Sequence, residues 1–135
     1  MAGEVSAADA VPVAEFRAAL RGFMRTSERN SRAAGLTPQR YLLLLMIKGA
    51  PDESEQSTVT ELADRLQLAQ STVTELVGRA EETGLVERER SVDDGRIAHL
   101  RLTPEGEQRL ADPFTSNAAE RGALRDAFAH LDPVA

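Results

Sequence analysis

Residues 58–83 read TVTELADRLQLAQSTVTELVGRAEET, and this stretch decides the fold. Thr58 followed three residues later by Glu61 is the capping-box pattern that begins a helix. The helix is short, because Gln67-Leu68-Ala69 forms a turn. A second helix is predicted from about Gln70 to Thr83, with inward-facing residues at helical spacing: Val73, Leu76, Val77 and Ala80. Two short helices joined by a tight turn form a helix-turn-helix unit.

A β-hairpin is predicted directly after this unit. Residues 85–90 and 97–102 are strand-like, and the second segment alternates apolar with polar side chains. Asp93-Asp94-Gly95 lies between them and is typical of a hairpin turn. A hairpin that follows a helix-turn-helix is the wing of a winged helix.

Helices are also predicted on both sides of the winged helix. A long helix runs from Val11 to about Gly35, and Thr37-Pro38 begins a second helix whose apolar run 41–47 makes it the buried centre. Residues 52–57 are expected to form a polar loop. Thr103-Pro104 begins another helix that continues through Leu110, Pro113 interrupts or kinks it, and residues 117–131 form a further helical segment.

The predicted fold class is therefore mainly α with a small β-hairpin wing. Residues 1–10 are small and polar and are expected to be a disordered tail. Residues 11–135 are then a single domain, in which 36–103 form the winged-helix lobe. The helices expected at 11–35 and 104–131 flank this lobe.

Composition excludes several other classes of protein. Apolar residues make up 41% and charged residues 28% of 135 residues, as in one ordinary globular domain. No stretch approaches the roughly 20 apolar residues of a membrane span, and no secretory signal is apparent, so the expected location is the cytoplasm. The absence of cysteine rules out disulfides and thiolate sensing, and two histidines make a metal site or cofactor unexpected.

The outer face of the second helix is the candidate DNA-reading surface. A recognition helix meets base edges and phosphates in the major groove. Hydroxyl groups can donate to phosphates, glutamine can pair with adenine, and a long arginine can reach a phosphate. The alternative is a solvated face with no partner, but the hairpin that follows favours DNA. The residues expected on this face are Gln70, Ser71, Thr72, Thr74, Glu75, Gly78 and Arg79.

The tip of the hairpin carries a second candidate contact. Arg96 follows Asp94 and Gly95, and an arginine on a narrow hairpin can enter the minor groove, where the potential is most negative over A·T-rich DNA. The alternative is a plain turn with a solvent-exposed arginine. The preceding helices favour DNA contact.

Taken in order, these motifs resemble the MarR family of bacterial regulators over roughly residues 11–112. Each motif is weak alone, but the ordered series is specific. It consists of LTPQRYLLL at 36–44, TVTELADRL at 58–66, QSTVTELV at 70–77, ETGLVER at 82–88, and DGR at 94–96 leading into LTPEG at 102–106.

The resemblance implies a homodimer held together by the first and last helices, which binds double-stranded DNA. It implies that Arg96 is the wing arginine and that Asp94 helps to orient it. Many members are repressors released by a small aromatic or phenolic ligand bound between the dimer body and the DNA-binding lobe. For this chain we expect a cytoplasmic homodimeric repressor of a pseudo-palindromic operator, with no membrane association.

Three features depart from the family pattern. The chain stops soon after Leu131, and Pro113 falls where a long dimerisation helix is expected. Glu75 lies on the reading face, where it could accept from cytosine or repel phosphate. Residues 57–103 carry nine carboxylates against six arginines, and the whole chain has a net charge of −6.

An effector site is predicted less directly. Arg17, Arg21, Arg40 and Tyr41 are candidates to hold a carboxylate or phenolate where the first helices meet the last ones. The interpretation we favour is a solvated arginine stripe with Tyr41 packed in the core.

Two other functions compete with repression. A winged-helix protein-interaction module that has lost DNA binding would fit the acidic balance and the short tail. An enzyme ranks last, because the sequence has no phosphate-binding glycine loop, catalytic triad or metal-ligand cluster.

Overall fold

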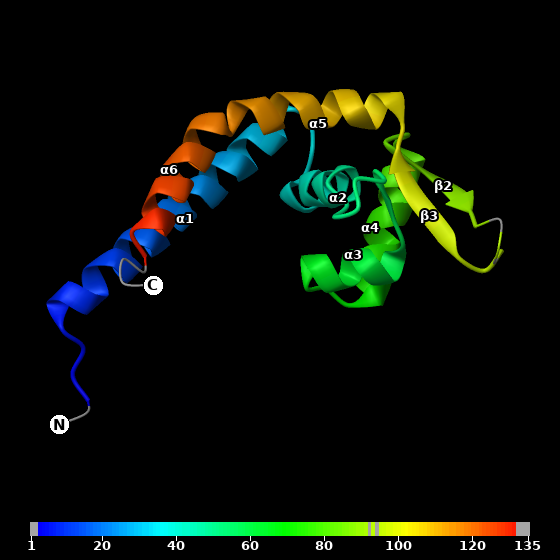
Figure 1. The fold of residues 1–135 in the computed structure, drawn as a ribbon. Helices are drawn as coiled ribbons and strands as arrows, with labels where there is room; N and C mark the ends of the chain where they lie inside the picture. Colours follow the sequence, from blue (N-terminus) through cyan, green and yellow to red (C-terminus); the bar gives the residue numbers. More distant parts are fainter. Residues whose placement is uncertain (1–2, 92, 94, 132–135) are drawn as a thin grey trace.

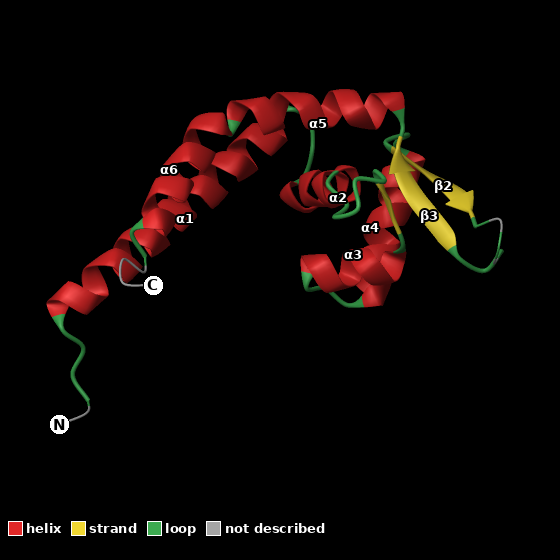
Figure 2. Ribbon diagram, viewed as in Figure 1, coloured by secondary structure: helices red, strands yellow, loops and turns green. Residues whose placement is uncertain are grey.

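The computed structural model of the chain describes residues 3–91, 93 and 95–131. Within these residues the chain forms six helices and three short strands. In order they are α1 (Ala7–Ala33), α2 (Pro38–Lys48), β1 (Gln56–Ser57), α3 (Val59–Leu66), α4 (Gln70–Glu82), β2 (Val86–Arg90), β3 (Ala98–Leu102), α5 (Pro104–Ser116) and α6 (Ala118–Ala129). The predicted fold class, mainly α with a small hairpin, is confirmed (Figure 2).

The elements form two parts, which we call the arm and the lobe. The arm is α1 with α6, which run side by side, and the lobe is α2, α3, α4 and the small sheet (Figure 1). The helix α5 lies across the lobe and leads into the arm. None of the helices among the described residues is both long and apolar enough to span a bilayer.

The core of the lobe is built around α2, as the apolar run predicts. Leu43, Leu44 and Ile47 are completely buried, and they pack with the buried residues Leu62, Val73 and Leu100 from α3, α4 and β3. Each large apolar side chain contributes about 1.5–3 kcal/mol when removed from water. Burial around α2 therefore holds three different elements in one lobe.

Side-chain caps begin three helices where the sequence predicts them. The Thr37 hydroxyl accepts from the Arg40 N–H at 3.1 Å, and Pro38 occupies the first turn of α2. The capping box of α3 is complete, with Glu61 N–H donating to Thr58 at 3.2 Å and Thr58 N–H donating to Glu61 at 2.8 Å. Thr103 accepts from Gly106 N–H at 3.0 Å at the start of α5.

The expected polar loop 52–57 contains a strand that the sequence does not indicate. β1 pairs antiparallel with β3, placing Gln56 opposite Arg101 and Ser57 opposite Leu100, so the sheet order is β1-β3-β2. A strand of two residues is too short to show an alternating pattern. The two-stranded wing is thus anchored to the lobe by a third strand.

Two predicted boundaries are wrong. The first helix begins at Ala7, inside the expected tail 1–10, because the Ser6 hydroxyl accepts from Asp9 N–H at 3.0 Å and caps it. Pro113 does not end α5, which continues to Ser116 with Pro113 buried. A proline removes one helical hydrogen bond, and packing against neighbouring helices holds the rest of the turn.

Gly106 marks the tightest approach between α5 and the winged helix. A methyl group at this position would overlap the carbonyl oxygen of Leu85 and lie 3.1 Å from its carbonyl carbon. Leu85 O also accepts from Thr103 N–H at 3.0 Å, so this backbone cannot retreat without losing a bond. Gly106 therefore permits α5 to pack directly on the segment that leads into the wing.

We expect Gly106→Ala to lower the free energy of unfolding by about 1–3 kcal/mol, as measured by urea denaturation, because the added carbon overpacks this contact. Gly122→Ala in α6 is the matched control, since its new carbon meets nothing closer than 3.8 Å. That control should stabilise the protein by about 0.5–1 kcal/mol through helix propensity. Equal effects of the two substitutions would contradict the packing argument.

Candidate functional site

The turn between α3 and α4 is closed by a left-handed residue. Gln67 caps the end of α3 with φ 57°, and Leu68 N–H donates to Ala63 O at 3.1 Å. These bonds satisfy carbonyl groups at the end of α3 and turn the chain sharply into α4. The predicted helix-turn-helix is present.

The helix α4 has two distinct sides. Val73, Val77 and Ala80 are completely buried on the side that meets the core. The opposite side carries most of the residues predicted to read DNA. Gln70, Ser71, Thr74, Glu75 and Arg79 are exposed, whereas Thr72 and Gly78 are half-buried. The predicted residues therefore share one accessible polar face, although their contact with DNA stays a prediction.

The acid on this face is paired with the arginine on the same face. Arg79 Nη2 lies 3.4 Å from Glu75 Oε1, one helical turn away, and the two side chains are 63% and 71% exposed. Because solvent screens the attraction between two charges this exposed, either side chain can exchange its partner at little cost in free energy. A phosphate that approaches Arg79 would compete with Glu75 for its guanidinium group.

Hydrogen bonds from the end of β2 hold the tip of the wing. Arg90 Nη1 donates to Gly95 O at 2.7 Å, and Ser91 N–H donates to Ile97 O at 2.8 Å. Gly95 and Arg96 are exposed at the tip, and their contact with DNA stays a prediction. Asp94, the predicted orienting acid, lies outside the described residues.

Other arginines of the lobe bind the scaffold itself. Arg65 donates to Met46 O at 3.0 Å and to Gly49 O at 3.2 Å, which fastens α3 to the end of α2. Arg88 Nε lies 3.0 Å from Glu81, and Arg101 lies 3.1 Å from Glu89. These contacts connect α4 with β2 and β2 with β3, so Arg88 and Arg101 are each paired with a carboxylate of a neighbouring element.

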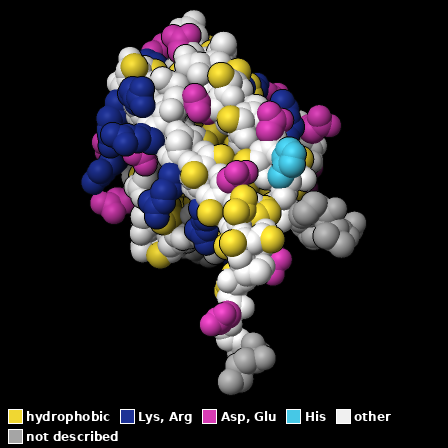
Figure 3. Space-filling model, turned by 90° about the vertical axis from the view of Figure 1, so that its left-hand side faces the viewer, with side chains coloured by type: hydrophobic (Ala, Val, Ile, Leu, Met, Phe, Trp, Pro, Cys, Tyr) yellow, Lys and Arg dark blue, Asp and Glu magenta, His cyan; other side chains and the backbone are white. Residues whose placement is uncertain are grey.

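The arm carries an exposed apolar face. Phe16 of α1 and Phe128 of α6 meet edge to face with ring centroids 6.0 Å apart, yet Phe128 is 63% exposed. An open groove beside them is lined by Phe16, Phe23, Leu124 and Phe128 with Arg121 and Arg125. Figure 3 shows hydrophobic side chains gathered near the end of the arm and basic side chains along one edge. Val11, Val13 and Met24 of α1 are also exposed.

The predicted effector residues lie in different environments. Arg17 and Arg21 are exposed on α1, and Arg40 is half-buried at the start of α2. Tyr41 is 3% exposed, and its hydroxyl accepts from Asn117 Nδ2 at 3.4 Å. Tyr41 is therefore packed in the core, as the interpretation favoured from the sequence expects.

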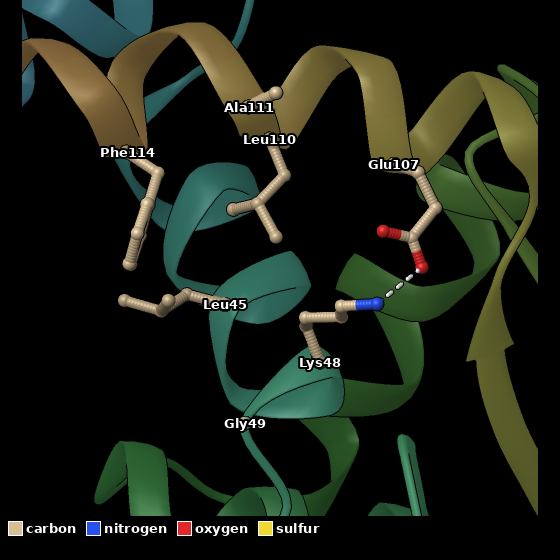
Figure 4. A pocket seen from close by; sticks show the side chains of 7 residues that line it. All are labelled: Leu45, Lys48, Gly49, Glu107, Leu110, Ala111 and Phe114. Atoms are coloured by element: carbon tan, nitrogen blue, oxygen red, sulfur yellow. Dashed lines mark hydrogen bonds and ion pairs between the residues drawn. The ribbon is translucent and has the colours of Figure 1, made fainter.

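A better-formed pocket lies between α2 and α5. Its volume is about 390 Å³, and its lining is Leu45, Lys48, Gly49, Glu107, Leu110, Ala111 and Phe114. Figure 4 shows the side chains of Leu45, Leu110 and Phe114 on one side and the Lys48–Glu107 ion pair, 3.0 Å long, on the other. Sequence reasoning missed this pocket, because nothing in the sequence pairs residue 48 with residue 107.

Lys48 bridges two carboxylates at the rim of this pocket. Besides Glu107, its ammonium group contacts Glu55 of the loop before β1. The hydrogen bonds that the Lys48 ammonium donates to Glu55 and Glu107 raise the pKa of Lys48 above its usual value. The hydrogen bond and charge of Lys48 in turn hold the pKa of Glu55 below its usual value. These three side chains connect α2, α5 and the loop.

Comparison with known proteins gives consistent results. A sequence profile of the MarR family matches residues 34–97. An uncharacterized HTH-type transcriptional regulator of Bacillus subtilis, YsmB, is 32% identical over 69% of this chain and 59% of its own length. A putative transcriptional regulatory protein for the hcr operon of Thauera aromatica is 35% identical over 70% of this chain and 52% of its own length. The chain thus spans between half and three fifths of the length of these two relatives.

A solved structure supports the fold over nearly the whole chain. Sco3205 from Streptomyces coelicolor, a MarR family transcriptional regulator solved in complex with DNA, superposes with a TM-score of 0.68. The match covers 92% of this chain and 78% of Sco3205 at 24% sequence identity. At that identity the likeness establishes the architecture alone.

The depressed pKa of Glu55 generates a pH-dependence prediction. Its stabilising contact is fully present above the ordinary carboxyl pKa of 4.5 and is lost as the pH falls through the lower value of the folded chain. We expect Glu55→Gln to lower the urea midpoint at pH 7, and the difference from the unsubstituted protein to shrink as the pH is lowered below 4.5. Glu53→Gln is the control, because Glu53 forms no ion pair with Lys48. A difference independent of pH would contradict the assignment.

Proposed function

Because the chain belongs to the MarR family of transcriptional regulators, we propose that it binds double-stranded DNA as a homodimer and represses genes by occupying a pseudo-palindromic operator. The observation that carries this proposal is the two-sided character of α4. Its apolar side is fully buried in the lobe, and its outer side offers amide and hydroxyl groups on an exposed helix that fits a major groove.

The wing supports the same proposal. Arg96 is exposed at the tip of a hairpin that follows α4 directly, and Arg90 holds the tip by its bond to Gly95 O. With α4 in a major groove, Arg96 reaches the flanking minor groove. Asp94 is proposed to orient it. The DNA-bound state of Sco3205 is a precedent in the same fold.

The exposed apolar face of the arm supports the homodimer. Phe128, Met24 and Val13 are each about half exposed or more, and the neighbouring groove is lined mostly by apolar side chains. A second copy related by two-fold symmetry would bury this face against itself. Such a pair presents two recognition helices to successive major grooves, about 34 Å apart.

We also propose that a small aromatic or phenolic effector binds the pocket between α2 and α5 and releases the DNA. The pocket lies between α2, the central helix of the lobe, and α5, and apolar side chains line most of it. A volume of about 390 Å³ accommodates a single small aromatic molecule. Arg17, Arg21 and Arg40 remain alternative candidates for holding an anionic group.

The DNA contact is tested by Arg96→Ala. We expect this substitution to weaken binding to a duplex selected from a random pool by about tenfold or more, as measured by gel shift. Arg109→Ala is the matched control, because it removes the same charge from α5, where Arg109 pairs with Glu105 at 3.2 Å. The control should bind like the unsubstituted protein. If no duplex is retained even at low salt, the chain is instead a winged-helix protein-interaction module.

The effector pocket is tested by Ala111→Trp, which places an indole ring in the pocket from an exposed position on α5. Any compound in a panel of aromatic carboxylates and phenols that releases the DNA should lose that effect on Ala111→Trp, as read by fluorescence anisotropy of labelled duplex. Gln108→Trp adds the same ring to an exposed position of α5 outside the pocket and should respond normally. Equal release from both variants would place the effector elsewhere.

A further inference from the structure

A single buried asparagine occupies the joint between the arm and the rest of the molecule. Asn117 ends α5 and begins α6, and it is 1% exposed. Its N–H donates to Pro113 O at 3.1 Å, and its carbonyl accepts from Arg121 N–H at 2.9 Å. The backbone therefore passes from one helix to the next through one residue, with φ −84° and ψ 1°.

Both polar atoms of the Asn117 side-chain amide form hydrogen bonds. Its oxygen accepts from Asn30 Nδ2 at 2.8 Å. Its nitrogen donates to the Ser27 hydroxyl at 3.3 Å and to the Tyr41 hydroxyl at 3.4 Å. An amide nitrogen has two hydrogens, so both donors have partners.

These partners belong to different parts of the molecule. Asn30 and Ser27 lie on α1, in the arm, whereas Tyr41 lies on α2, at the centre of the lobe. The chain crosses between the two parts at residues 34–37 and again at Asn117. The Asn117 side chain, at the second crossing, thus bonds to both α1 and α2. Hydrogen bonds are directional, and an unpaired amide buried at this depth is unfavourable, so the cluster favours one angle between arm and lobe.

We propose that Asn117 is the positioning residue that sets the angle between the arm and the lobe, and thereby the separation of the two recognition helices in the dimer. The inference rests on the proposed dimeric DNA binding. The lobe projects away from the joint (Figure 1). A small rotation at Asn117 therefore produces a larger displacement of α4 relative to α4 of the second copy. The spacing between half-sites that the dimer prefers should change with this displacement.

Single hydroxyl deletions separate this role from general stability. Tyr41→Phe removes the bond from Asn117 to Tyr41 of the lobe and leaves the ring buried. Ser27→Ala removes a bond from the same Asn117 nitrogen to the arm, so it is the matched control. Asn117→Ala removes all three bonds, and urea denaturation first establishes which variants are folded.

The experiment measures binding to a series of duplexes that carry the same two half-sites with the spacer changed by one base pair at a time. We expect the unsubstituted chain and Ser27→Ala to prefer one spacing by about tenfold. Tyr41→Phe should bind several spacings with similar affinity. A wild-type spacing preference in folded Tyr41→Phe would overturn the inference, as would an equal loss of preference in Ser27→Ala.

A second measurement does not require DNA. The chain has no cysteine, so spin labels can be placed at Ala14→Cys on α1 and Thr60→Cys on α3, both exposed, in labelled chain diluted into unlabelled chain. Double electron–electron resonance should give one narrow distance for the unsubstituted protein and Ser27→Ala, and a broader one for Tyr41→Phe. If the distribution of distances between the spin labels is as narrow in Tyr41→Phe as in the unsubstituted protein, the inference is overturned, even if the variant still binds DNA. If the unsubstituted chain binds no duplex but the distance distributions have the expected widths, the proposed function is overturned. The role of Asn117 in setting the angle between the arm and the lobe then still stands.

Discussion

The burial of three small side chains on α4 is the constraint on which the rest of the structure depends. Val73, Val77 and Ala80 pack against the core built on α2, and this contact fixes the rotation of α4 about its own axis. A helix repeats every 3.6 residues, so fixing one side determines the other. The polar outer side of α4 is accessible because the apolar side is buried in the core, which turns the opposite side toward solvent.

Different polar side chains hold different elements of this packing in place. Arg65 and Arg88 hold helices and strands in place, and Asn117 connects the arm to the lobe through buried amide and hydroxyl groups. Lys48 joins α2 to α5 and to the loop before β1. The apolar core assembles the lobe, and directional polar contacts orient its parts.

Local sequence patterns were sufficient to predict the winged helix and the composition of its outer face. Capping at Thr37, Thr58 and Thr103 and the apolar spacing of α4 are properties of neighbouring residues, and the structure confirms them. Strand β1, the uninterrupted α5 and the Lys48–Glu107 pocket depend on residues distant in sequence. In the sequence, Asn117 is only the first residue of a predicted helical segment, and its burial arises where α1, α2 and α5 converge.

The pairing of Arg79, Arg88 and Arg101 with carboxylates has a kinetic consequence. Arg79, Arg88 and Arg101 each lie within 3.4 Å of a glutamate, so their fields largely cancel beyond the length of the pair. Long-range attraction accelerates encounters only where charge is uncompensated. These three arginines would therefore contribute little to steering the lobe toward a polyanion during its diffusional search. A preference for one site over another would then be expressed chiefly in how long the complex persists.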